Sequence, residues 1–144
     1  MVGRSVAAKL LLKPGQRIAV VAAPADYATL VGGLPAGATV TATPTRDADV
    51  IHLFVEDRAA LAARWPAVAA ALGPETLLWI SYPKRGPGVT TDLTRDVGWG
   101  PVHASGYDPV TQIAIDATWS ALRYRHDPAL RAAREERGAR VGRD

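Results

Sequence analysis

The sequence of 144 residues contains no cysteine, and this absence excludes several kinds of chemistry. Disulfides, thiolate nucleophiles, cysteine-bound zinc and iron–sulfur clusters all need a thiol. No stretch approaches the roughly 20 apolar residues that span a membrane. The first apolar run contains Lys9 and meets Lys13-Pro14-Gly15, so it lacks the features of a signal peptide. We therefore expect a cytoplasmic protein that does not interact with membranes.

The remaining composition is that of an ordinary globular protein, with 48% apolar and 22% charged residues. A chain of this length fits one domain. From Arg123 onward, seven arginines outnumber four carboxylates, and this excess equals the whole net charge of +3. The sequence predicts one domain over residues 1–127 and an arginine-rich helix or tail over 128–144. A solvated charged face is the commoner role for such a tail, and nucleic-acid binding is the weaker alternative.

Alternating strand and helix signals define the fold class. Short apolar or β-branched runs predict strands over residues 18–23, 38–43, 49–55 and 76–82, and helical patterns follow at 26–31 and from Glu56 to about Leu72. Two alternating runs, 110–116 and 119–124, predict a terminal antiparallel hairpin. The order favours a small Rossmann-like, doubly wound α/β domain with a mainly parallel sheet. This layout resembles that of small-molecule methyltransferases.

Two local features complicate the predicted helices. Pro66 lies among the apolar positions of the second helical segment, so we expect a break or restart there. Thr91 or Asp92 could cap a further, irregular helix, which Gly98, Gly100 and Pro101 should keep short.

The usual cofactor motifs are absent. In a doubly wound sheet, ligands bind beyond the carboxyl ends of the strands. The first such loop, Ala23-Pro24-Ala25-Asp26-Tyr27, lacks the glycines that let a backbone approach a pyrophosphate or an adenosyl group. A phosphate-binding P-loop and the Gly-x-Ser-x-Gly and His-Glu-x-x-His motifs are also missing. His52, His103 and His126 show no metal-ligand spacing, and a core role is favoured for His52. We expect no cofactor and no metal.

The strongest polar cluster runs from Tyr82 to Trp99. Lys84 and Arg95 could hold an anionic ligand, and Asp96 could act as a base. The candidate ligand-binding residues at the carboxyl ends of the strands are Pro24, Asp26, Tyr82, Lys84, Asp92, Arg95 and Trp99, and the weak catalytic candidates are Lys84, Arg95 and Asp96.

A purely structural interpretation of this cluster is favoured over a functional one. Asp92 would then cap a helix, Arg95 and Asp96 would form structural ion pairs, and Trp99 would pack. At the hairpin turn, Asp116 is expected to accept turn hydrogen bonds and Trp119 to cover the sheet edge.

Several separated segments resemble the bacterial domain of unknown function 3052 family. They are residues 9–24, 79–84 (Trp-Ile-Ser-Tyr-Pro-Lys), 92–99 and 115–125 (Ile-Asp-Ala-Thr-Trp-Ser-Ala-Leu-Arg-Tyr-Arg), in that order along the chain. The likeness spans residues 8–126 and leaves the arginine-rich extension outside. The resemblance implies a compact bacterial cytoplasmic domain and carries no established activity or catalytic residue.

Three functional hypotheses follow from the sequence. The first is a module that binds a small anionic ligand or a protein partner, a second copy of the chain included, without a nucleotide cofactor. The second is a small enzyme, related to methyltransferases in layout, that uses Lys84, Arg95 and Asp96 on an acidic metabolite. The third is weak nucleic-acid binding through the basic tail.

Overall fold

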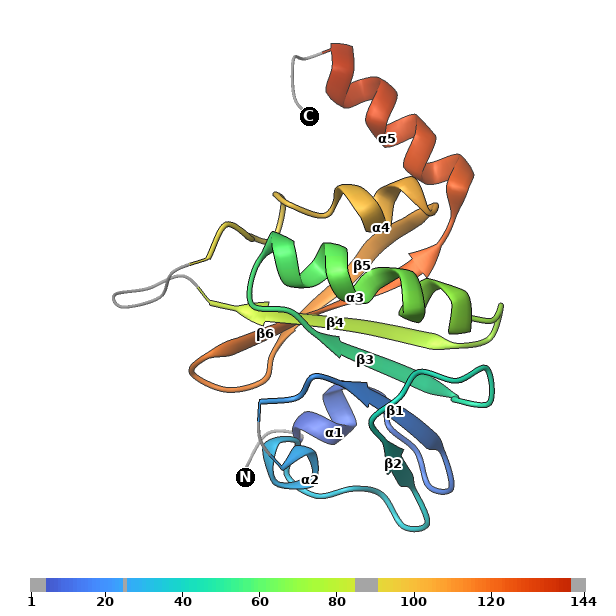
Figure 1. The fold of residues 1–144 in the computed structure, drawn as a ribbon, viewed down its shortest axis with the longest axis vertical. Coiled ribbons are helices and arrows are strands. Elements are labelled where there is room, and N and C mark those ends of the chain that lie inside the picture. The colour runs from blue at the N-terminus through green and yellow to red at the C-terminus, as the bar shows by residue number, and fades with distance from the viewer. Residues whose placement is uncertain (1–4, 25, 85–90, 141–144) are drawn as a thin grey trace.

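The computed structural model describes residues 5–24, 26–84 and 91–140, with side chains to Arg137 (Figure 1). In chain order the elements are α1 (Val6–Lys9), β1 (Arg17–Val21), α2 (Tyr27–Leu30), β2 (Thr39–Thr41), β3 (Val50–Phe54), α3 (Arg58–Ala71), β4 (Leu77–Pro83), α4 (Gly100–Ala104), β5 (Tyr107–Ala114), β6 (Trp119–His126) and α5 (Pro128–Arg140). The strands form one sheet in the order β2-β1-β3-β4-β6-β5.

The sheet has the predicted mixed topology. β2, β1, β3 and β4 are mutually parallel, while β6 runs antiparallel to β4 and to β5. β5 and β6 form the terminal hairpin that their alternating sequence predicts. Each predicted strand is present with its ends shifted by a few residues.

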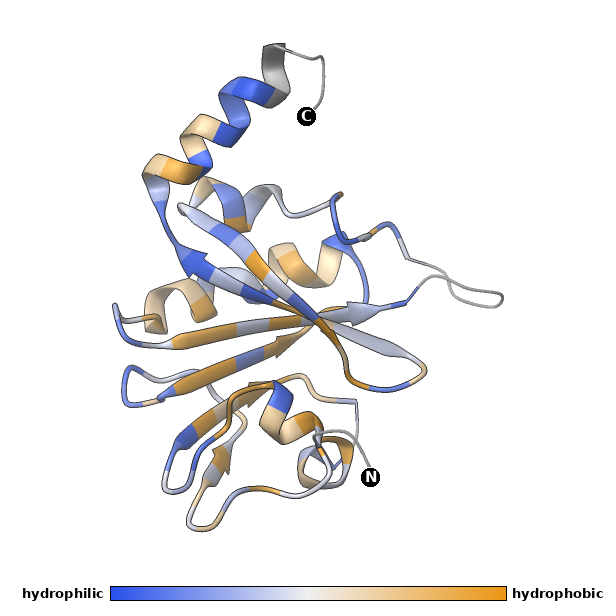
Figure 2. Cartoon of the chain, turned by 180° about the vertical axis from the view of Figure 1, so that it is seen from behind, coloured by the Kyte–Doolittle hydropathy of each residue, from blue (hydrophilic) through white to orange (hydrophobic). Residues whose placement is uncertain are grey.

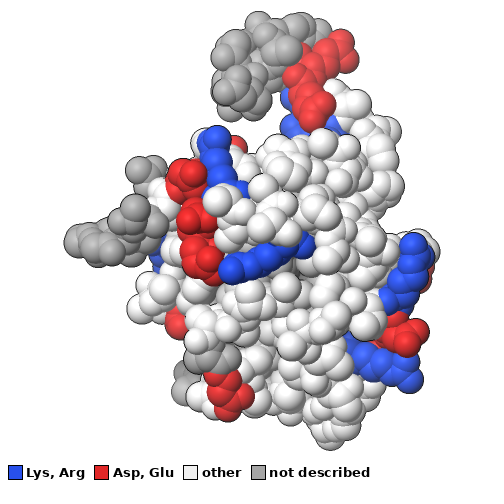
Figure 3. All heavy atoms as spheres, in the orientation of Figure 1, with Lys and Arg blue, Asp and Glu red and all other residues white. Residues whose placement is uncertain are grey.

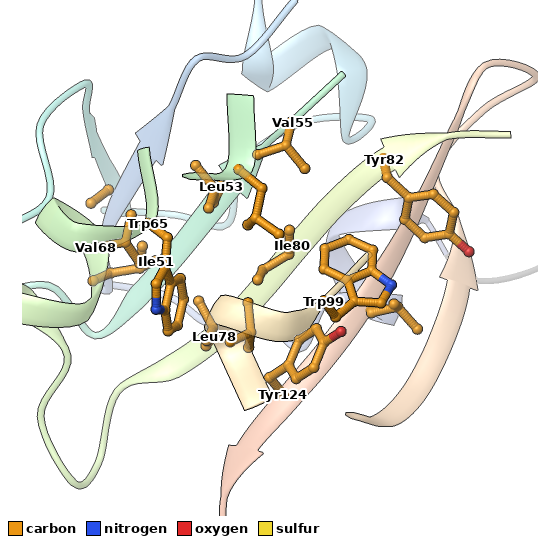
Figure 4. Close-up of a cluster of buried hydrophobic side chains, with 14 of the residues drawn as sticks. Ile51, Leu53, Val55, Trp65, Val68, Leu78, Ile80, Tyr82, Trp99 and Tyr124 are labelled. Carbon is orange, nitrogen blue, oxygen red and sulfur yellow. The ribbon is translucent and has the colours of Figure 1, made fainter. Parts of the chain in front are cut away.

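Side chains of successive strand residues build two separate cores. In the fully buried β3, Ile51 and Leu53 face α3 and α4, whereas Val50 and Phe54 face α1 and α2. Figure 4 shows the first core, where Trp65 and Val68 of α3 meet Leu78 of β4. This alternation explains the nearly continuous apolar sequence of the central strands, because such strands bury both faces.

Two helix expectations were wrong. α3 is continuous from Arg58 to Ala71, with Pro66 inside it and exposed. Leu61, Trp65, Val68 and Ala71 are buried on one face of this helix, and their packing on the sheet holds it together across the proline. The second error concerns the segment after Thr91, which is irregular. A short helix, α4, begins at Gly100, where the glycines and proline were expected to end one.

The two ends of the chain add helices of different kinds. α1 has no predicted counterpart. It is a single turn capped by Ser5, and Leu10, directly after it, is fully buried. α5 forms within the arginine-rich tail and extends away from the body, and Figure 2 shows that it is largely hydrophilic. Within the part of the chain that the structure describes, no helix combines the length and the apolar composition needed to cross a membrane.

Candidate functional site

The carboxyl ends of the parallel strands meet at one edge of the sheet, as the predicted crevice requires. The hairpin turn between β5 and β6 reaches the same edge, where the Lys84 N–H donates to the Thr118 carbonyl at 2.7 Å. Asp116 accepts hydrogen bonds from the N–H groups of Thr118 and Trp119, both at 2.8 Å. Asp116 therefore has the turn role that the sequence favours. Trp119 is structural too, but it packs against Phe54 in the second core from β6, an interior strand, rather than over the sheet edge.

The first loop at this edge is held by the chain itself. Asp26 caps α2, accepting from the Ala28 N–H at 3.2 Å and from the Thr29 hydroxyl at 2.8 Å. Pro24 is exposed beside it. Ala22 has a φ of 62°, a left-handed conformation that glycine adopts more readily. The chain therefore takes a left-handed residue at Ala22, after β1, without using glycine, and the Asp26 carboxylate is engaged in the cap.

Two carboxylates cap the N-terminus of α3. Asp57 accepts from the Ala60 N–H at 2.8 Å, and Asp92, far along the chain, accepts from the Arg58 N–H at the same distance. Thr91 adds a hydrogen bond of 2.7 Å from its hydroxyl to the Glu56 carbonyl. Asp92 is thus a helix cap, but of α3 rather than of a helix that follows it. Figure 3 shows acidic side chains gathered over this part of the surface. An anionic ligand would compete here with the protein's own carboxylates.

Tyr82, Arg95, Asp96 and Trp99 do come together. Arg95 and Asp96 line an open hollow of about 240 Å³, together with Pro109, Val110, Thr111, Gln112 and Leu122 of the terminal hairpin. We call this the Arg95 hollow. Tyr82 is 4% exposed; its hydroxyl accepts from Gln112 Nε2 at 3.1 Å, and its ring meets Trp99 edge-on at 5.5 Å. Trp99 packs as predicted, its indole N–H donating to the Thr94 carbonyl at 2.8 Å.

The charges of the hollow act on Tyr82. Burial raises the pKa of the Tyr82 hydroxyl; the nearby Arg95 opposes this rise and Asp96 adds to it. Arg95 and Asp96 form an ion pair of 3.3 Å, with side chains 63% and 75% exposed. A pair this exposed contributes about 0–1 kcal/mol, so a ligand can replace one partner at low cost. Lys84 is not among the described residues that line this hollow.

Sequence reasoning missed a buried hydrogen-bonded chain at the centre of the sheet. The two ring nitrogens of His52 lie 2.7 Å from the Tyr27 hydroxyl and 2.6 Å from the Ser81 hydroxyl. His52 and Ser81 are fully buried, and burial lowers the pKa of His52 to about 3. His52 is therefore the satisfied core residue that the sequence favoured. The signal available in the sequence was that His52 and Ser81 are polar residues inside apolar strand segments. That they pair with each other could not be predicted, because it depends on the order of the strands in the sheet.

A second hollow lies at the opposite side of the sheet. It has a volume of about 450 Å³ and is open to solvent, and it is lined by Arg17, Ile18, Thr39, Thr41, Thr45, Asp47 and Ala48. None of the residues predicted as ligand-binding lines it. Across residues 5–24, 26–84 and 91–137, no three histidine, aspartate or glutamate side chains are grouped so as to hold a metal ion.

No protein-family model and no curated protein matches the sequence. Among solved structures, the chain is similar to a protein of the NADB-Rossmann superfamily from Streptococcus agalactiae, with a TM-score of 0.55 at 11% identity over 88% of this chain and 70% of that one. It is similar to DhpI in its complex with SAH, with a TM-score of 0.54 at 12% identity over 84% and 80% of the two chains. The B. subtilis tRNA methyltransferase TrmK gives a TM-score of 0.52 at 11% identity over 90% and 69%. Together with the sheet order, these likenesses confirm the Rossmann-like α/β fold.

Proposed function

We propose that this chain is a Rossmann-like module that binds a small molecule bearing a carboxylate or phosphate in the Arg95 hollow, without a nucleotide cofactor. We also propose its membership of the bacterial domain of unknown function 3052 family, on the motifs given above. The observation that carries the binding proposal is that Arg95 and Gln112 line one hollow, in which the hydroxyl of the buried Tyr82 holds the Gln112 amide by a hydrogen bond of 3.1 Å.

The donors of the hollow suit an anionic group. Arg95 offers a planar set of N–H donors that matches a carboxylate or phosphate. Gln112 donates one amide N–H to the buried Tyr82 hydroxyl, which fixes the orientation of the amide and leaves its second N–H for a ligand oxygen. Because burial raises the pKa of Tyr82, the hydroxyl keeps its proton at neutral pH.

The rest of the lining suits an apolar ligand body. Pro109, Val110 and Leu122 contribute apolar surface beside the donors. A hollow of about 240 Å³ has room for a compact acid with one ring or a short chain. Binding there would bury apolar surface and replace the exposed Asp96 partner of Arg95 by the ligand's own anion.

The two other functional hypotheses receive less support from the described contacts. The enzyme hypothesis needs the Lys84 side chain beside Arg95 and Asp96, and Lys84 is not among the described residues that line the hollow with them. The nucleic-acid hypothesis needs tail arginines that are available to phosphates, and two of them, Arg131 and Arg134, are engaged by the buried Asp108.

The test is an NMR titration of the full chain with benzoate and phenyl phosphate, with benzylamine as the cationic counterpart of the same ring. We expect both anions to shift the side-chain N–H signals of Arg95 and Gln112. Arg95→Gln should abolish these shifts, and Tyr82→Phe should weaken binding because the Gln112 amide loses the hydroxyl that orients it. Arg46→Gln, which removes an exposed arginine elsewhere, is the matched control.

Other compounds address the alternatives. S-adenosylmethionine and SAH are included because the fold is shared with a protein solved with SAH. A hundredfold excess of a true ligand over its dissociation constant stabilises the protein by about 2.7 kcal/mol, which a thermal-shift assay detects. Shifts that persist in Arg95→Gln, or no response to any anion, would refute the proposed site and direct the search to protein partners.

A further inference from the structure

Outside the hollow, the most strongly charged buried cluster joins α5 to the start of β5. Asp108 is fully buried and accepts from Arg131 at 3.0 Å and from Arg134, both on α5. The two arginines are three residues apart and so lie on the same face of the helix. Arg131 also lies over His103 of α4, with Nη1 at 3.2 and 3.4 Å from the two ring nitrogens.

This cluster is the main polar link between α5 and the body. α5 packs against β5, and beyond this contact the helix extends away from the domain (Figure 1). Displacement of α5 would separate the Asp108 carboxylate, which is buried with the helix in place, from both of its cationic partners, and breaking such a pair is strongly unfavourable. The charge on Asp108 therefore ties the position of the helix to the conformation of the β5 backbone.

The residues that follow Asp108 form one wall of the Arg95 hollow. Pro109 pairs with Tyr124 and Thr111 pairs with Arg123, so Val110 is an extra, bulged residue in β5. Pro109, Val110, Thr111 and Gln112 all line the hollow. A bulge interrupts the hydrogen-bonded ladder and re-aims the side chains around it. The arginine-held Asp108 is thus covalently adjacent to the irregular backbone that shapes the site.

We propose that α5 regulates the Arg95 hollow: when docked on Asp108 it holds the β5 bulge in the shape that binds the ligand, and its release loosens that wall. This inference rests on the proposed function for its ligand and on the Asp108 cluster for its mechanism. The coupling runs over directly bonded or hydrogen-bonded groups, from Arg131 and Arg134 through Asp108 to Val110.

Two readouts that need no ligand test the coupling. Glutamyl endopeptidase cleavage at Glu135 and Glu136 reports the release of α5, and amide exchange at Val110, Thr111 and Gln112 reports the bulge. The variant is Arg131→Gln combined with Arg134→Gln, and Arg137→Gln on the same helix is the control. We expect cleavage and amide exchange at the bulge to be faster in the double variant by about tenfold or more, while amide exchange in β3 stays unchanged. In the Arg137→Gln protein, neither cleavage nor exchange should change. Asp108→Asn, which removes the charge while keeping the shape, replaces the double variant if that one does not fold.

A benzoate titration of the same variants adds the functional readout. We expect the affinity of the double variant for benzoate to be about fivefold or more below that of the wild-type protein, which is the usual scale of coupling between sites. Faster cleavage with unchanged exchange at the bulge would overturn the coupling, and unchanged cleavage would overturn the role of Asp108 in holding α5. If amide exchange at the bulge rises in the double variant but the wild-type protein binds no anion, the coupling is supported and the proposed ligand is refuted. Failure of the coupling and failure of the proposed function therefore give different results.

Discussion

His52 and Ser81 are joined side chain to side chain across β3 and β4, with 2.6 Å between His52 Nε2 and the serine hydroxyl. On the other side of the ring, the Tyr27 hydroxyl lies 2.7 Å from Nδ1. Tyr27 is the first residue of α2, directly after the loop that follows β1. One buried imidazole therefore fixes the first loop to the two central strands, and a neutral ring can satisfy both hydroxyls because it has one donor and one acceptor.

The buried His52 should make stability depend on pH. Its pKa is about 3 in the folded protein and about 6.5 in the unfolded chain, so below pH 6.5 the unfolded chain binds a proton that the folded protein does not. This contribution is present in full above pH 6.5 and is lost as the pH falls toward 3, by up to about 1.4 kcal/mol per pH unit. Urea unfolding at pH 7.0, 6.0 and 5.0 measures it.

His52→Gln and His103→Gln are the matched pair for this measurement. Burial also lowers the pKa of His103, which gives a loss of the same sign, but this ring is only partly buried. We expect His52→Gln to be less stable at pH 7 and to show a much flatter pH profile, while His103→Gln keeps most of the slope. An equally steep profile in His52→Gln would contradict the assignment.

Ala22 should be more stable as glycine. A left-handed conformation costs a non-glycine residue about 1–2 kcal/mol, and the added freedom of glycine in the unfolded chain returns about 0.5–1 kcal/mol of that. We expect Ala22→Gly to raise the free energy of unfolding by about 0.5–1 kcal/mol in urea denaturation. Ala23→Gly, one residue along, lacks a positive φ to relieve and should be destabilising. Equal losses in the two variants would show that the Ala22 backbone is not strained.

The two carboxylates at the start of α3 should contribute separately. Asp57 and Asp92 bind different N–H groups, those of Ala60 and Arg58. We expect Asp57→Ala and Asp92→Ala to cost about 1 kcal/mol each, the usual value of a cap, and the double variant to be less stable than either single variant. Urea denaturation compares them with Glu75→Ala, an exposed carboxylate in the loop before β4. An Asp92→Ala protein as stable as the Glu75→Ala control would contradict capping across the chain.

Pro66 should lower the stability of the protein, and the packing of α3 on the sheet outweighs this cost. It removes one N–H from the helix ladder and crowds the preceding turn, at a cost of about 3 kcal/mol in a helix interior, partly offset by the stiffness of proline in the unfolded chain. We expect Pro66→Ala to stabilise the protein by about 1–2 kcal/mol in thermal or urea unfolding. Pro74→Ala, in an exposed turn, should be neutral or slightly destabilising. A loss in Pro66→Ala would mean that the proline ring itself contributes to packing.

The site was predictable only in part. Tyr82, Arg95, Asp96 and Trp99 lie within 18 residues of one another in the sequence, and the described segment 91–99 carries the last three of them. The residues of the hollow that come from the hairpin, such as Gln112 and Leu122, were not predicted. Their positions depend on β6 inserting beside β4 and on the bulge at Val110, neither of which has a local sequence pattern.

The sequence by itself determined the six strands of this protein, the helices α2 and α3, and the fold class. Apolar runs of strand length, alternating with helical patterns and ending in an alternating hairpin, leave little choice beyond a mainly parallel sheet covered on both faces. Only the tertiary structure decided that α3 continues through Pro66, that Asp92 caps a helix 34 residues earlier in the chain, and that Asp108 holds α5. The physical reason is that periodicity reports which face of an element is buried, whereas caps, ion pairs and hollows depend on which distant segments meet.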